Sequence, residues 1–148
     1  MTFFRPVMIA ALACALTGCG HSKPAPDLSP KGGYPKTSSD WRTPVAHITA
    51  LEVAPTTTGA IVTARGLPPT QGYWGAALIP ENDGQPVDGV ITYRFVLAKP
   101  PVGSPDSQRA GNPPSREVTA GAFINAIRFA QTKQVVVIGA DGSRTAHR

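Results

Sequence analysis

Cysteine is scarce in this chain of 148 residues and occurs only at Cys14 and Cys19. Residues 20–148 contain none, so the sequence excludes a disulfide, a thiolate nucleophile and a cysteine-based metal site from that stretch. Aromatic residues make up only 7% of the chain and charged residues 16%. A domain built from these residues depends on its hydrophobic core, rather than on covalent links, for its stability.

Helical periodicity is missing as well. No long window repeats apolar residues every 3.6 positions, which excludes a helical bundle and argues against an α/β sheet. The 15 glycines and 16 prolines indicate turns, loops and short strands. Apolar residues still form 41% of the chain and cluster in short runs, which argues against a disordered protein.

Groups that could carry catalysis are few. The three histidines are His21, His47 and His147, and none lies in a Gly-x-Ser-x-Gly elbow. A Ser-His-Asp hydrolase needs a histidine beside its nucleophile, and we assign His47 instead to a polar position at the rim of the domain. Neither paired acids for glycoside cleavage nor a glycine-rich phosphate loop is evident. The sequence therefore predicts no catalytic residue and favours a protein that is not an enzyme.

One acidic stretch has oxygen ligands of the kind that Ca²⁺ binds. Glu81, Asp83 and Asp88 lie within eight residues of one another. Their spacing is not that of a calcium loop, and Asn82-Asp83-Gly84 is common turn chemistry. We therefore predict a turn here, with no metal and no cofactor.

The chain is basic, with a formal net charge of +5, but its positive residues are spread along the sequence rather than gathered on one element. Nucleic acid is therefore not an expected partner. Weak attraction to acidic polymers or acidic proteins remains compatible with this charge.

The first eighteen residues have the organisation of a secretory signal. Arg5 precedes an uninterrupted apolar run at residues 7–16, and the small residues Thr17 and Gly18 follow it. The run is far shorter than the ~20 apolar residues that a spanning helix needs. We predict a signal peptide at residues 1–18.

The residues Leu16-Thr17-Gly18-Cys19 resemble the lipobox of bacterial lipoproteins at all four positions. The resemblance implies that the Cys19 thiol carries a diacylglycerol, that the signal is cut between Gly18 and Cys19, and that the new amine is acylated. Membrane attachment through lipid on Cys19 would then be firm. With Gly20 next, the family pattern implies the outer membrane, facing the periplasm, in a host with two membranes. The alternative is an ordinary signal in which Cys19 takes no part.

Residues 19–44 follow as a predicted tether. Residues 21–44 contain five prolines among scattered Ser, Gly and Lys, and show no apolar periodicity. This composition predicts a disordered segment between the lipidated cysteine and the domain. Trp41, near its end, is expected to pack on the edge of the domain.

Residues 45–148 are predicted to form an all-β domain, a small antiparallel β-sandwich of six to seven strands. Strand patterns occur at residues 45–53, 59–65, 73–79, 90–98, 134–139 and 143–147. In the first, Val45, Thr49, Leu51 and Val53 are expected on one side. The clearest is 90–98, where Ile91, Tyr93, Phe95 and Leu97 alternate with polar positions. Residues 116–130 are ambiguous between strand and helix.

The domain resembles an immunoglobulin or fibronectin type III sandwich. Trp74 stands at the place of the core tryptophan, and residues 134–145 look like a final hairpin around Asp141-Gly142. The resemblance lacks the disulfide of true immunoglobulin domains. A small barrel is the alternative architecture.

Two features are candidates for a binding surface. One is the Pro/Gly/Ser-rich loop at residues 99–116, with Arg109 and Arg116. The other is Gly72-Tyr73-Trp74, where Tyr73 should face outward if Trp74 faces the core. The leading hypothesis is a lipid-anchored envelope protein with a non-catalytic binding or assembly domain for a protein or glycan. The alternatives are an envelope hydrolase with residues gathered from separate strands and a structural spacer.

Overall fold

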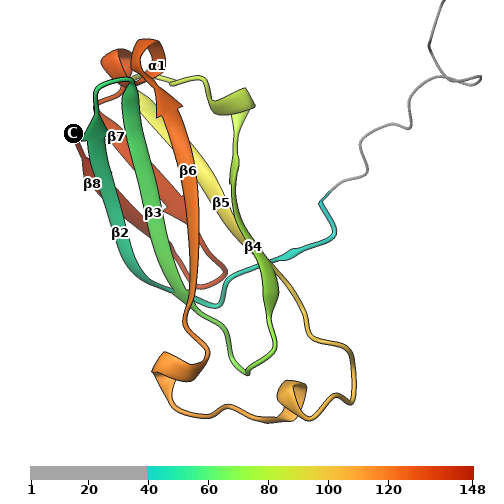
Figure 1. The fold of residues 1–148 in the computed structure, drawn as a ribbon. Helices are drawn as coiled ribbons and strands as arrows, with labels where there is room; N and C mark the ends of the chain where they lie inside the picture. The colour runs from blue at the N-terminus through green and yellow to red at the C-terminus, as the bar shows by residue number, and fades with distance from the viewer. Residues whose placement is uncertain (1–39) are drawn as a thin grey trace, which may run out of the picture. The chain divides into compact units, whose positions relative to one another are not determined.

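The computed structural model describes residues 40–148, which form two β-sheets packed face to face (Figure 1). The predicted signal peptide, the cleavage site at Gly18 and Cys19, and most of the predicted tether lie outside the described residues. The strands are β1 (Thr43–Pro44), β2 (His47–Thr56), β3 (Gly59–Leu67), β4 (Trp74–Pro80), β5 (Val90–Ala98), β6 (Val118–Asn125), β7 (Gln134–Ile138) and β8 (Ser143–His147). The helical segments are η1 (Asn82–Gly84), η2 (Asp106–Gln108), η3 (Pro113–Ser115) and α1 (Ala126–Gln131). The predicted all-β sandwich is confirmed.

One sheet contains three strands in the order β2-β3-β6, and the other contains β1-β5-β7-β8 with β4 paired to β5. Strand β5 is the centre of the larger sheet. Ile91, Phe95 and Leu97 are buried between the sheets and Tyr93 is nearly so, as the alternation at residues 90–98 predicts. Val62 on β3 and Val137 on β7 are among the fully buried side chains that pack around them.

The larger sheet is mixed, which corrects the expectation of purely antiparallel pairing. Strand β5 pairs in parallel with β7, from Val90 opposite Gln134 to Arg94 opposite Ile138. Between them the chain crosses to the other sheet, where β6 runs antiparallel to β3, and then returns. A parallel neighbour needs such a crossover connection, and here a strand of the opposite sheet with α1 supplies it.

The stretch at residues 116–130, which the sequence left ambiguous between strand and helix, contains a strand followed by the start of a helix. Strand β6 ends at Asn125, whose side-chain oxygen accepts a hydrogen bond of 2.9 Å from the Arg128 amide and caps α1. Phe129 on α1 packs into the core. The six-residue helix therefore closes one end of the sandwich before β7 begins.

The first predicted strand is interrupted in the structure. Val45 is buried between β1 and β2 rather than within a continuous strand. A register shift between Ile48 and Ala50 then turns Thr49 outward, where its hydroxyl donates a 2.8 Å hydrogen bond to Glu117. Leu51 and Val53 do face the core, so the predicted one-sided pattern holds for them and is wrong for Thr49.

Trp74 is not a core tryptophan, and this corrects the predicted place of Trp74 and Tyr73. Trp74 is 57% exposed, whereas Tyr73 is half-buried and packs against the core. The cause is a β-bulge: Trp74 pairs with Ala98, but the next pair is Ala77 with Val96. One extra residue on β4 reverses the alternation of side chains, so Trp74 lies on the opposite face from the inward Leu78.

Candidate functional site

The backbone before β1 is held against β4 by a single arginine. The carboxylate of Asp40 accepts hydrogen bonds from the Arg42 side chain, at 2.9 Å from Nε and 2.7 Å from Nη2. Arg42 Nη1 also donates to the carbonyl of Gly75 at 2.8 Å. Strand β1 then pairs with β5 through Thr43 and Pro44, which the sequence placed in the tether. These contacts orient the residues on either side of Arg42.

Trp41 and Trp74 form an exposed aromatic pair at this place. Their ring centroids are 5.7 Å apart and the rings are tilted by 52°. Trp41 is 66% exposed, so most of both rings faces solvent. Trp41 thus packs on the domain edge, as the sequence predicts, and its partner there is the tryptophan expected in the core. A tilted pair at this separation is a favourable aromatic arrangement.

Gly75 connects the Arg42 hydrogen bonds to the tryptophan pair, and its backbone conformation explains how both can form. Gly75 has a φ of +59°, a left-handed conformation that a residue with a Cβ adopts at a cost. It lies inside the bulge, it offers its carbonyl to Arg42, and a Cβ there would lie 3.9 Å from the Arg42 side chain. The glycine is the signal in the sequence that could have placed Trp74 outside the core.

Arg116, a predicted binding residue, bends back on its own loop. Its Nη1 donates to the carbonyls of Ala110 at 2.7 Å and Gly111 at 3.3 Å, and its Nε is buried without a hydrogen-bond partner in residues 40–148. The structure thus places Arg116 as a brace of the loop. Arg109 is exposed, and its backbone carbonyl accepts a hydrogen bond from the Gln71 amide.

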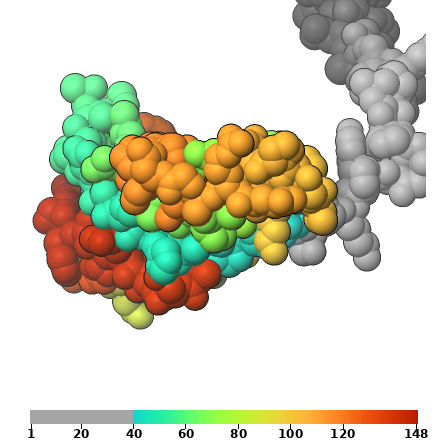
Figure 2. Space-filling model, turned by 90° about the horizontal axis from the view of Figure 1, so that it is seen from below, coloured from blue at the N-terminus to red at the C-terminus, as the bar shows by residue number. Residues whose placement is uncertain are grey.

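The loop that contains both arginines lies over one end of the sandwich (Figure 2). Besides the Arg109 contact, the Gln71 side chain donates a 2.8 Å hydrogen bond to Ser115. A Cβ on Gly72 would lie 2.9 Å from Asp106, which shows how closely the loop approaches the chain before β4. The loop is therefore tied to the β3–β4 connection, while Tyr73, next to it, turns inward.

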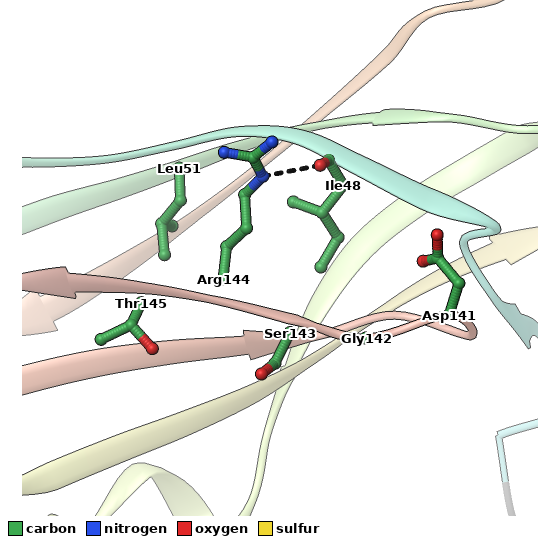
Figure 3. A pocket seen from close by; sticks show the side chains of 7 residues that line it. All are labelled: Ile48, Leu51, Asp141, Gly142, Ser143, Arg144 and Thr145. Atoms are coloured by element: carbon green, nitrogen blue, oxygen red, sulfur yellow. Dashed lines mark hydrogen bonds between the residues drawn. The ribbon is translucent and has the colours of Figure 1, made fainter.

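A cleft of about 520 Å³ opens where the edge strands of the two sheets meet (Figure 3). Strand β2 is an edge of one sheet and β8 is an edge of the other. The lining residues are Ile48, Leu51, Asp141, Gly142, Ser143, Arg144 and Thr145. Arg144 Nε donates a 2.7 Å hydrogen bond across the cleft to the carbonyl of Ile48. The sequence carries no signal for this cleft, because the cleft depends on which strands become the edges of the two sheets.

His47 lies at the same edge and is hydrogen-bonded through Nδ1 to the carboxylate of Asp141. Both side chains are at least half exposed. In Figure 3, Ser143 projects from the face of β8 opposite to Asp141 and Arg144, so its hydroxyl does not point toward the carboxylate of the pair. The pair occupies the polar rim position that the sequence predicts for His47, and the alternative of a hydrolase gains no nucleophile from it.

The acidic residues at 81–88 form turns. Asn82, Asp83 and Asp88 all have φ between 50° and 53°, a conformation that Asn and Asp tolerate. The Oε1 atom of Glu81 lies 4.0 Å from Nε of Arg94 on β5. Within residues 40–148 no group of three His, Cys, Asp or Glu side chains is placed to hold a metal ion. The predicted turn is confirmed, and these carboxylates do not converge on one point.

No family model matches this chain, and neither a curated protein nor a solved structure is significantly similar to it. In the part of the chain that the structure describes, no helix combines the length and apolar character needed to cross a membrane.

Proposed function

We propose that this chain is a lipid-anchored envelope protein whose sandwich domain binds an envelope protein or glycan through Trp41 and Trp74. The proposal has two parts that stand separately. The anchor is supported by the lipobox residues up to Cys19. The binding role is supported by one observation, the exposed tryptophan pair at the edge of β4.

Exposed tryptophans are costly in a domain that has so few aromatic residues. Trp41 and Trp74 are both of the tryptophans in the chain, and both are more than half exposed. Tryptophan is enriched among the residues that dominate binding energy at interfaces, because its large ring buries much apolar area at little entropic cost. An aromatic pair of this kind marks a recognition surface better than scattered single side chains do.

The pair is also preorganised. Asp40, Arg42 and the Gly75 carbonyl hold the backbone on both sides of the rings. A surface that is ordered before binding loses less conformational entropy when the partner arrives. The arginine brace therefore supports the interpretation of the pair as a binding surface.

The test compares Trp41→Ala and Trp74→Ala with Ile127→Ala, which removes a side chain of 75% exposure from α1. Cells expressing each variant are crosslinked, and proteins attached to the chain are quantified by mass spectrometry. Glycan binding is measured in parallel by co-sedimentation of the purified chain with insoluble peptidoglycan. Each tryptophan variant is expected to lose about 30-fold in affinity, or about 2 kcal/mol, because truncation of a central aromatic has this effect.

The controls separate the alternatives. Ile127→Ala should keep full binding, and thermal unfolding should show that all variants fold, since the replaced side chains are exposed. A partner that both tryptophan variants retain would contradict the proposed surface. A structural spacer predicts no partner or glycan that depends on either tryptophan.

A further inference from the structure

Strand β8 is an edge strand that combines unpaired backbone N–H and C=O groups with a charged side chain, Arg144, that points inward. In the β7–β8 hairpin the backbone amide of Arg148 donates a hydrogen bond to the carbonyl of Lys133, and the amide of Gly139 donates one to the carbonyl of Gly142. In an antiparallel pair the bonded positions alternate. Every second residue of β8 therefore directs its N–H and C=O away from β7, namely Ser143, Thr145 and His147.

These outward groups have no strand beside them in residues 40–148. Strand β8 pairs with β7 alone, and β2 pairs with β3 alone. The two edges are bridged by a side chain, through Arg144 Nε and the Ile48 carbonyl. A free edge of this kind is a template for an added strand.

Arg144 decides which strand such an edge could accept. It is opposite Val137, a fully buried residue, and so lies on the inner face of the sheet (Figure 3). Beyond its bond to Ile48, its guanidinium has no hydrogen bond or ion pair in the described part of the chain. A charged residue that points inward at an edge disfavours an arbitrary strand. A strand that brings a carboxylate into the cleft would instead pair with the free nitrogens.

The surrounding charges favour the same occupant. The lining of the cleft contains one basic side chain, Arg144, and one acidic side chain, Asp141, which is already bonded to His47. On β2, Glu52 is exposed and alternates with the inward Leu51 and Val53, so its carboxylate faces away from the cleft. Apolar side chains of an added strand would meet Ile48 and Leu51, which line the cleft.

We infer that β8 accepts an extended segment of a partner protein as an added strand, with an acidic side chain of that segment bound by Arg144. The inference uses a different surface from the tryptophan pair and does not depend on it. Main-chain hydrogen bonds to Ser143, Thr145 and His147 would hold the segment, and the carboxylate would set its register.

The test uses the purified full chain and the peptide acetyl-TVTETVT-amide, with the same peptide carrying Gln in place of Glu as control. Binding is followed by NMR, through the shifts and hydrogen-exchange rates of the amides of residues 143, 145 and 147. The Glu peptide is expected to slow exchange at these three amides and to bind about tenfold more tightly than the Gln peptide, because a charged hydrogen bond is gained.

Two variants test whether the peptide binds along β8 and whether Arg144 causes the preference for Glu. Thr145→Pro removes an outward N–H without touching the bonds to β7, and should abolish binding of both peptides. Arg144→Glu should reverse the preference, so that a peptide with Lys at the central position binds best. Equal affinity for the Glu and Gln peptides, or shifts confined to residues outside β2 and β8, would overturn the inference.

Discussion

Asp40 is the residue whose chemistry is most altered by the fold. Its hydrogen bonds with Arg42 lower the pKa of its carboxyl from 3.8 to about 2. The carboxylate is partly buried, and its hydrogen bonds help to hold the Arg42 side chain beside Gly75. The brace of the tryptophan pair therefore depends on one titratable group.

The pH dependence of this brace has a defined direction. A lowered folded-state pKa means that the contribution of Asp40 to stability is present above pH 3.8 and is lost as the pH falls toward about 2. We expect the tryptophan emission of the wild type to change across this interval as the segment around Trp41 loosens. Asp40→Asn lacks the titratable group and should show no such step; the same step in the variant would assign the change to another group.

Tyr93 illustrates the opposite effect in the core. Burial raises the pKa of its phenol above the usual value for tyrosine, and the charge of Arg128 lowers it by a smaller amount. Sequence alternation alone placed Tyr93 on the inner face of β5, so this residue was predictable. Trp74 was not, because its face depends on the bulge rather than on its own type.

Strands β3 and β6 approach each other very closely where β3 begins, at Gly59. Gly59 has a φ of +154°, and a Cβ there would lie 1.9 Å from the carbonyl oxygen of Ile124 on β6. No real Cβ tolerates such a contact with backbone, so one of the two strands would have to move. The pairing of β3 with β6 therefore requires glycine at this position.

The expected result for Gly59→Ala is a loss of about 3 kcal/mol in the free energy of unfolding, from backbone strain and displacement of β6. Gly121→Ala is the matched control, because its Cβ would lie at an ordinary 3.7 Å from Val62 and its φ is not positive. Urea unfolding of both variants measures the difference. A Gly59→Ala protein as stable as Gly121→Ala would show that β6 does not approach β3 this closely.

The elements themselves were largely predictable. The strand at residues 90–98, the hairpin at 134–147 and the long loop that follows β5 all have local signals, in period-two alternation or turn residues. The boundary inside residues 116–130 was not, because Val118 to Asn125 is a strand only through its pairing with β3. Pairing with a distant strand overrides weak local preference.

At the scale of the whole molecule, the proposed anchor makes its own prediction. Cys19→Ser should move the chain from the membrane fraction to the soluble fraction, because lipid on the thiol is the proposed attachment. Intact-mass measurement of the wild type should show a chain that begins at Cys19 and carries the acyl groups. A wild-type chain of unmodified mass in the soluble fraction would instead support the ordinary secretory signal.

The sequence by itself determined the β class of this protein, its main turns and the inner face of β5, since these follow from local alternation and turn chemistry. Only the tertiary structure decided that Trp74 faces outward, that β5 and β7 run parallel, and that β2 and β8 meet at a cleft containing Arg144. Each of these depends on register or sheet order, which are set by hydrogen bonds between segments distant in the chain. Both candidate binding surfaces arise at such places.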